Sequence, residues 1–417
     1  MIMGTGILVT MGVSLLTGCN VQNEVKDFAN YAKSVEEITI PKEVRIVALG
    51  EATHGNKEFQ ELKLDVFAHL VETTKVRAFA LEGDFGGCAI TNDYILHDKG
   101  TAKEAVENLS FDIYKTDEML ELVEWMHDYN LGVEDEEKVR LYGFDMQRNE
   151  EMVKRIKDFY HLVDEKKGDD YITKWDTFYV KEGIAVSSEN LSKLRGLVEE
   201  LIADLKENRE SYMKVTNEEL YAYALQSANC LLQHLDLHGA ANDYKAYAEF
   251  RDKYMAENVK WILDREESVY GAKLMIAGHN GHVAKAINSF YTSMGVYLSE
   301  EMEEEYFVIG TDFYKTNCNI ATKETRKDYQ FCSDDPLAKA VEDMEKNVYY
   351  LDFAAARESE ELSVLLDNEM KTGSLGESYS PLMKIIKRSY QLNLAPATLY
   401  DGMIFVYEAT PIEVWEN

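Results

Sequence analysis

The sequence predicts an α/β fold with a mostly parallel central sheet covered by helices. Short apolar runs that end in glycine or an acid alternate with segments of helical periodicity, which is the pattern of a helix-covered parallel sheet. A long stretch, about 150–267, has helical periodicity and almost no strand signal. We therefore expect one α/β domain over residues 20–417 of the 417-residue chain, with a large helical insertion at about 150–267.

The clearest unit is a predicted strand–helix–strand segment near the start of the domain. Val44–Leu49 and Lys75–Leu81 are short apolar runs, and the helix between them begins near Asn56. The apolar residues of that helix recur at three- and four-residue steps and so share one face: Phe59, Leu62, Val66, Phe67, Leu70 and Val71. This is the pattern of a βαβ unit.

Further elements follow the same alternation. Strands are predicted at Val139–Gly143, Lys273–Ala277, Tyr306–Gly310, Val348–Phe353 and Met403–Tyr407. Helices are predicted within Gly86–Leu131, Glu189–Arg209, Asn217–Leu237, Asp243–Arg265 and Asp334–Met344.

The amino-acid composition of the chain excludes one class of binding partner. The chain carries 76 acidic and 44 basic residues, a formal charge of −32, and nucleic acid is excluded because phosphate binding needs a basic surface. A hydrophobic content of 46% with only five prolines argues against disorder. The acidic surface either serves solubility alone or concentrates a cationic substrate.

The N-terminal segment resembles a bacterial lipoprotein signal. Residues 1–18 carry no charge, and Leu16-Thr17-Gly18-Cys19 matches a lipobox. The resemblance implies a signal and anchor at 1–19, lipidation of Cys19, and a location at the cell membrane facing outside the cytoplasm. The segment departs from the pattern in lacking a basic start, and a buried N-terminal segment is the alternative.

The other cysteines do not form a recognisable chemical motif. Cys88, Cys230, Cys318 and Cys332 fit neither a zinc motif nor a disulfide-rich scaffold, so isolated thiols are expected, and Cys318–Cys332 is the one pair close enough in sequence to suspect. No GxSxG elbow occurs and Cys88 has no local histidine partner, which leaves water as the expected nucleophile.

Polar residues that could do chemistry follow several of the predicted strands. They are Glu51, His54, Glu82, His279 and His282. Ligands of open α/β sheets collect at the carboxyl ends of strands, so these side chains are expected to share one site. Asp145 follows the strand Val139–Gly143 and could face the same cleft or cap the next helix.

The order and spacing of these motifs resemble the erythromycin esterase family. Gly50-Glu51-Ala52-Thr53-His54-Gly55 resembles the family's GExxHG turn, and the basic helix residue Lys63 and the strand-end Glu82 follow at the family's spacing. Arg251-Asp252 with Met255-Ala256 and Asn258 resembles its RDxxMAxN helix. His279-Asn280-Gly281-His282 resembles its HNxH turn, and the likeness runs from about Ile40 to about Asp312.

The resemblance implies hydrolysis of an ester or lactone, with a macrolide macrolactone among the candidates, and no cofactor. It assigns the general base to His54 and implies that Glu51 or Glu82 orients the ring. His279 would bind or protonate the leaving alkoxide, and Lys63 would help stabilise the oxyanion. His282 and Asp145 are expected to bind substrate. Lys63 stands where the family has arginine, a departure that loses the bidentate fork.

Two other functions remain open from the sequence. The ExxH and HxxH pairs offer nitrogen and oxygen ligands, so a metal-dependent hydrolase could use the same residues, although both pairs lie in turns and do not match the helical HExxH arrangement. The second alternative function is that of a surface-anchored lipoprotein that binds a ligand without turnover.

Overall fold

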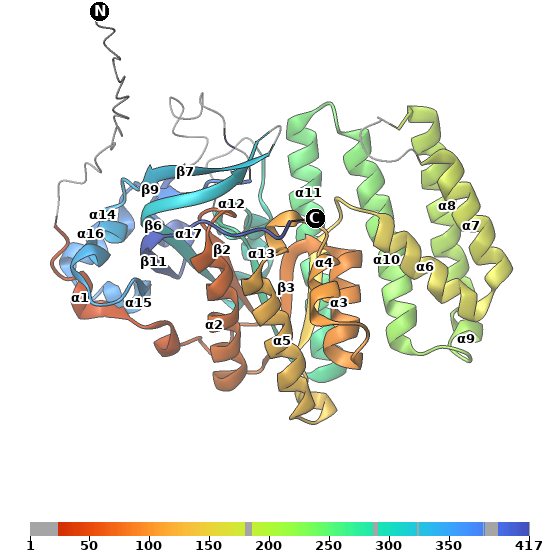
Figure 1. Cartoon of the computed structure of the whole chain (residues 1–417), viewed down its shortest axis with the longest axis horizontal. Helices are drawn as coiled ribbons and strands as arrows, with labels where there is room; N and C mark the ends of the chain where they lie inside the picture. The colour runs from red at the N-terminus through yellow and green to blue at the C-terminus, as the bar shows by residue number, and fades with distance from the viewer. Residues whose placement is uncertain are drawn as a thin grey trace, which may run out of the picture.

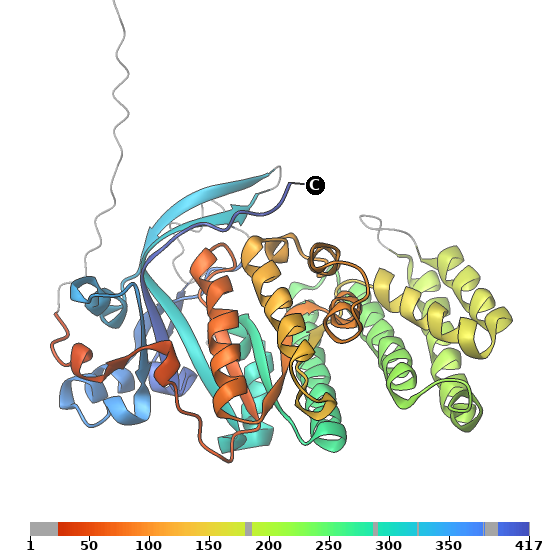
Figure 2. The same cartoon turned by 60° about the horizontal axis from the view of Figure 1, so that its bottom comes forward.

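The computed structural model describes residues 24–179, 186–286, 291–322, 325–377, 379 and 391–416. They form one large mixed sheet with helices on both faces (Figures 1 and 2). Along the sheet the strands lie in the order β1 (Ala32–Lys33), β8 (Val348–Asp352), β11 (Gly402–Ala409), β6 (Tyr306–Ala321), β2 (Ile46–Glu51), β5 (Lys273–His279), β3 (Val76–Asp84) and β4 (Arg140–Asp145). The ninth strand, β7 (Arg326–Cys332), pairs with β6.

The centre of the sheet is parallel, which confirms the predicted fold class. Each neighbouring pair from β11 to β4 runs parallel, whereas β8, β1 and β7 are antiparallel additions. The carboxyl ends of β2, β5, β3 and β4 therefore meet along one edge.

Alternate residues of the central strands pack into two different cores. In β2, Ile46 and Ala48 join one core, and Val47 and Leu49 join the other. A strand points successive side chains to opposite faces, so a continuous apolar run suits a sheet covered on both sides. On one face α2 (Lys57–Thr73) packs beside α5 (Asp117–Leu131).

The expected helical region follows β4 and forms a lobe at that end of the sheet (Figure 1). Its helices are α6 (Glu150–Val163), α7 (Glu165–Phe178), α8 (Ser188–Glu207), α9 (Arg209–Tyr212), α10 (Glu218–Gly239) and α11 (Tyr244–Tyr270). Of these, α11 packs against both β4 and β5 and so reaches the carboxyl edge of the sheet.

The remaining helices connect strands or cover edges. They are α1 (Phe28–Tyr31), α3 (Phe85–His97), α4 (Ala102–Glu107), α12 (Asn280–Val283), α13 (Met294–Met302), α14 (Pro336–Ala340), α15 (Phe353–Ala356), α16 (Glu360–Asp367) and α17 (Pro396–Leu399). A two-stranded sheet pairs β9 (Met370–Gly373) with β10 (Gln391–Leu394). Among the described helices, none is long and apolar enough to cross a membrane.

Two elements are present as predicted but end at different residues. The strand expected at Tyr306–Gly310 continues to Ala321 and forms a hairpin with β7, which has mostly polar, solvent-facing residues and so lacks an apolar signal. The helix expected at Asp334–Met344 is shorter, because α14 ends at Ala340 and a 3₁₀ turn follows.

The suspected Cys318–Cys332 pair does not form. Cys318 lies opposite Tyr329 in the hairpin register, and it is a buried free thiol, as are Cys88 and Cys230. Cys332 is not a free thiol, so the expectation of an isolated thiol was wrong at that position. The predicted signal segment at 1–19 lies outside the described residues.

Candidate active site

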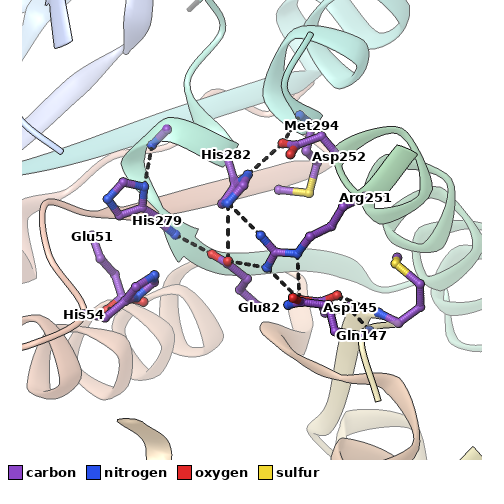
Figure 3. Close-up of polar contacts among 12 residues, drawn as sticks. Glu51, His54, Glu82, Asp145, Gln147, Arg251, Asp252, His279, His282 and Met294 are labelled. Atoms are coloured by element: carbon purple, nitrogen blue, oxygen red, sulfur yellow. Dashed lines mark hydrogen bonds and ion pairs between the residues drawn. The ribbon is translucent and has the colours of Figure 1, made fainter. Parts of the chain in front are cut away.

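Acids and imidazoles gather at the carboxyl edge of the sheet, as predicted. Glu51 ends β2, His279 ends β5 and Glu82 lies near the end of β3, and these three strands are neighbours. Glu51 and His279 lie directly opposite one another in the β2–β5 register. Figure 3 shows that His54 and His282 lie beside them, so the structure brings together all five residues singled out at strand ends.

The first group consists of Glu51, His54 and Lys63. His54 Nδ1 lies 3.7 Å from Glu51 Oε2, and Lys63 Nζ lies 3.1 Å from the same oxygen. Lys63 also donates to the carbonyl oxygen of Phe59 at 3.2 Å and to Gln60 Oε1 at 2.9 Å. Lys63 is 0% exposed and is therefore not a solvated charge on the helix surface.

Electrostatics in this group favour the ionised carboxylate. Burial works against ionisation of Glu51, but the positive charge of Lys63 and the contact with His54 hold its pKa below the ordinary value. Burial also opposes protonation of His54, but Glu51 outweighs that effect and raises the pKa of His54. Burial lowers the pKa of Lys63 despite the attraction of Glu51.

Backbone contacts from distant segments hold the turn that carries His54. The carbonyl oxygen of Gly55 accepts from the backbone N–H groups of Asn319 at 2.9 Å and Ile412 at 3.1 Å. The Asn56 side chain donates to the carbonyl oxygens of Asn317 at 3.0 Å and Thr410 at 2.8 Å. The β6–β7 hairpin and the C-terminal segment therefore fix the turn from one side.

Glu82 is the centre of the second group. Its Oε2 accepts from the backbone N–H of His279 at 2.7 Å, and its Oε1 accepts from Arg251 Nη2 at 2.7 Å. A Cβ atom at Gly278 would lie 2.9 Å from Glu82 Oε2, so only glycine allows this approach. Burial alone would raise the pKa of Glu82, but His282 and Arg251 hold it well below its usual range.

Arg251, on α11, bridges the ends of β3 and β4. Its guanidinium donates to Asp145 Oδ2 from both Nε, at 3.1 Å, and Nη2, at 2.6 Å. Asp145 accepts in addition from the backbone N–H groups of Met146 and Gln147. Asp145 is therefore a ligand of Arg251 and caps no helix; α6 begins after Asn149.

His282 is held on both ring nitrogens. Its Nδ1 donates to Asp252 Oδ1 at 2.7 Å, and its Nε2 accepts from Arg251 Nη1 at 3.0 Å. Burial disfavours the charged ring, yet Asp252 and Glu82 raise the pKa of His282. Asp252 Oδ1 also accepts from the backbone N–H of Met294, which ties α11 to α13.

His279 has one nitrogen engaged and one without a partner. Its Nδ1 accepts from the backbone N–H of Gly281 at 3.2 Å, which places the proton on Nε2. That Nε2 is buried and has no hydrogen-bond partner among the described residues. The ring centroid lies 5.2 Å from that of His54. Burial and the neighbouring His54 and His282 lower the pKa of His279 to about 3.

Arg251 and Asp252 belong to the family-like helix motif, but their sequence context predicted no role for either residue. In the sequence they form an adjacent Arg-Asp pair on a helix that precedes a strand. Such pairs are common on solvated helix faces, so the pattern does not mark a functional site. Asn280 was missed in the same way: it is buried and donates to the carbonyl oxygens of Thr311 and Gly373. It fastens the turn after β5 to β6 and β9.

Within the described part of the chain, no three His, Cys, Asp or Glu side chains are arranged to hold a metal ion. The acids that could serve are engaged: Glu82 and Asp145 bind Arg251, and Glu51 pairs with Lys63. The acids at this edge are therefore already paired with cations of the protein itself.

A cavity of about 840 Å³ lies at the opposite edge of the sheet, lined by residues that include Thr39, Tyr306, Asp352 and Asp401. None of the strand-end acids or histidines lines it. We place the site by the convergence of chemical groups, because cavity volume alone says nothing about reactivity.

The fold and the site together define an α/β protein with a buried acid–base cluster at the carboxyl edge of a parallel sheet. The sequence profile described as Erythromycin esterase matches residues 71–409. The chain therefore belongs to the erythromycin esterase family and is an erythromycin esterase-like hydrolase. Glu51, His54 and Lys63 precede the matched residues, so their place in the site rests on the geometry above.

Individual relatives are distant. The putative hydrolase YbfO of Bacillus subtilis (strain 168) is 24% identical over 403 residues, covering 88% of this chain and 84% of that protein. Erythromycin esterase type II of Escherichia coli is 24% identical over 322 residues, covering 69% and 74%. A solved structure of an erythromycin esterase mutant in its open conformation has a TM-score of 0.63 at 16% identity, covering 88% and 91%, and shows the likeness of fold.

Proposed function

We propose that this hydrolase cleaves an ester or lactone by attack of a water molecule that His54 activates. The observation that carries the proposal is the facing pair of imidazoles, His54 and His279, with ring centroids 5.2 Å apart and pKa values shifted in opposite directions. Titratable groups whose surroundings separate their pKa values are typical of acid–base sites.

His54 is suited to the role of general base. Glu51 lies behind its Nδ1 at 3.7 Å, and the charge of the carboxylate favours the positive charge that develops when Nε2 takes a proton from water. The carboxylate stays ionised because Lys63 lies 3.1 Å from it. Lys63 Nζ already contacts three oxygens of the protein, those of Glu51, Phe59 and Gln60. We therefore assign Lys63 to positioning Glu51 and not to stabilising the oxyanion.

His279 is suited to hydrogen-bond donation. With Nδ1 accepting from Gly281, its neutral ring presents Nε2–H, and a pKa of about 3 keeps the ring neutral at working pH. A neutral donor would stabilise the tetrahedral oxyanion or the leaving alkoxide without transferring its own proton first.

Glu82, Arg251 and His282 support this pair. Glu82 accepts the backbone N–H of His279 and so fixes the end of β5, while Arg251 holds Glu82, Asp145 and His282 together. The polar atoms of Asp145 and His282 are engaged within the protein, so we propose that they orient Arg251 and reach substrate through it.

The substrate class we propose is a small-molecule ester or lactone. The name of the Escherichia coli relative adds a macrolide lactone to the panel worth testing. Fold alone does not select among these, since one fold serves many substrates.

The test is hydrolysis by purified protein of a macrolide and a panel of simple esters, with His54→Ala beside wild type. We expect kcat/KM to fall about 10²–10⁴-fold in His54→Ala, as is usual for loss of a general base. His161→Ala, an exposed histidine beside Asp169, is the matched control and should keep full activity. A His54→Ala enzyme with wild-type turnover would refute the assignment.

We also propose that the mature chain is anchored to the cell membrane through a lipid on Cys19, outside the cytoplasm. The lipobox-like Leu16–Cys19 after an uncharged apolar run supports this. In detergent phase partitioning, wild type should enter the detergent phase and Cys19→Ala should stay in water. Identical partitioning of the two would exclude the anchor.

A further inference from the structure

A second cluster of imidazoles lies in the helical lobe, away from the acid–base site. His234 and His238 are four residues apart on α10, so they project from the same face of the helix one turn apart. Their ring centroids are 4.6 Å apart. Neither residue has a part in the proposed hydrolysis.

The Nε2 atoms of both rings point at one oxygen atom. Tyr179 Oη lies 3.0 Å from His234 Nε2 and 3.4 Å from His238 Nε2. Asn149 Nδ2 donates to the same phenol oxygen at 2.8 Å. The two nitrogens thus face one small volume. A metal–nitrogen bond is about 2.0–2.1 Å long, so an ion bound to both would lie closer to the rings than Tyr179 Oη does.

His234 is also fixed in the tautomer that a metal ligand needs. Its Nδ1 donates to the backbone carbonyl oxygen of Met146 at 2.9 Å, which leaves Nε2 as a lone-pair donor. Metal-bound histidines commonly have their other ring nitrogen held by a carbonyl or carboxylate in this way.

We propose that His234 and His238 bind one divalent transition-metal ion, of the Cu²⁺, Ni²⁺ or Zn²⁺ class, between their Nε2 atoms and beside Tyr179 Oη. Imidazole nitrogen is a preferred ligand for these ions, and affinity for a given nitrogen site is highest for Cu²⁺. The phenol of Tyr179 either gives way to water or supplies a third ligand. Two charged side chains act on this place: Glu150 favours a bound cation, and Arg148 opposes one.

The place of the cluster in the fold gives the ion a structural role. His234 reaches the carbonyl oxygen of Met146, and the next residue, Gln147, donates from its side chain to Asp145, the partner of Arg251. Asn149 begins α6, and Tyr179 follows α7. An ion on α10 would therefore tie the start of the lobe to the turn after β4.

The experiment is an equilibrium titration of the full chain with Cu²⁺ in competition with a weak chelator, read by electron paramagnetic resonance. Wild type should bind one ion with a signal that shows coupling to two imidazole nitrogens. His238→Ala should weaken binding at least about tenfold, the minimum cost even of losing an outer partner. His238 is half-buried and its ring makes one long polar contact, so this variant should fold, which circular dichroism checks.

Three further variants decide where the ion sits. Tyr179→Phe should still bind, because the two imidazoles remain. His279→Ala should bind as wild type does, which separates this site from the cluster at the strand ends, and His161→Ala controls for a surface histidine. The proposal is overturned if His238→Ala binds like wild type, if His279→Ala abolishes the signal, or if wild type fails to compete with the chelator.

Discussion

Lys63 Nζ lies 3.1 Å from Glu51 Oε2 in the interior of the protein, where neither side chain is more than 1% exposed. Two buried charges of opposite sign stabilise each other only while both are present, because the remaining one would be left uncompensated away from water. The lysine on α2 thus decides whether the acid at the end of β2 can stay ionised beside His54.

Removing this lysine should destabilise the protein. Lys63→Met leaves Glu51 buried without its cation, and breaking a buried pair typically costs about 3–5 kcal/mol in the free energy of unfolding. Chemical denaturation measures it. Lys57→Met is the control on the same helix: Lys57 is half exposed and pairs loosely with Glu61 at 3.4 Å, so it should change stability by about 1 kcal/mol or less. Equal losses in the two variants would contradict the pairing.

The pH profile should report the contact between Glu51 and His54. A general base works when unprotonated, and Glu51 raises the pKa of His54, so the acid limb of wild-type kcat/KM should lie above the usual histidine value of about 6.5. In Glu51→Gln the burial of His54 remains without the carboxylate, and the limb should move to lower pH. We also expect the plateau to drop about tenfold or more. Glu61→Gln should leave the limb in place, and an unmoved limb in Glu51→Gln would assign it to another group.

Even a conservative substitution of Arg251 should be damaging. Lysine cannot supply Nε, Nη1 and Nη2 donors to Asp145, His282 and Glu82 at once, so Arg251→Lys should lose about 2–5 kcal/mol of stability and most activity. Lys253→Met, an exposed neighbour on α11, is the control.

The Arg251→Lys variant should also change how the stability of the protein depends on pH. Arg251 and His282 hold the folded-state pKa of Glu82 below its unfolded value, so this stability is present above the unfolded pKa and is lost as pH falls. The loss of stability on acidification should be smaller in Arg251→Lys than in wild type. Parallel stability curves for the two proteins would show that Arg251 does not set the ionisation of Glu82.

Trimming the C-terminal segment should loosen the His54 turn. Thr410 accepts at its carbonyl from Asn56 Nδ2 and from the backbone N–H of Lys57, and Ile412 donates to Gly55. Deletion of residues 410–417 should speed amide exchange around His54 and lower kcat about tenfold. Deletion of residues 416–417 alone should do neither. Unchanged exchange after the longer deletion would mean that the β6–β7 hairpin suffices.

Chelation should leave hydrolysis intact. The acids at the strand ends are engaged with Arg251 and Lys63, and acid–base chemistry by His54 needs no ion. Activity after dialysis against a chelator should equal that of undialysed enzyme, in wild type and in His238→Ala alike. Loss of activity restored by zinc or manganese would transfer His54 and His279 to a ligand shell.

Local sequence was enough to locate most of the candidate site. Apolar runs followed by polar residues mark strand ends, and Glu51, Glu82 and His279 were found in this way because the period and the length of such runs are local properties. The same holds for the amphipathic helix at 57–73 and for the helical region, whose periodicity extends over whole turns. The family likeness then pointed to His54 as the base.

Only the tertiary structure decided how these residues meet. The strand order places β5 between β2 and β3. His279 therefore lies opposite Glu51 on one side, and its backbone N–H donates to Glu82 on the other. His279 is about 200 residues away from both acids in the chain. Lys63 reads like any charged residue on a helix until α2 packs it beneath Glu51, and Arg251 acquires its role only when α11 crosses the ends of β3 and β4. Burial changes what a charged side chain must do, because an ion in the interior needs a partner that the surrounding fold alone can supply.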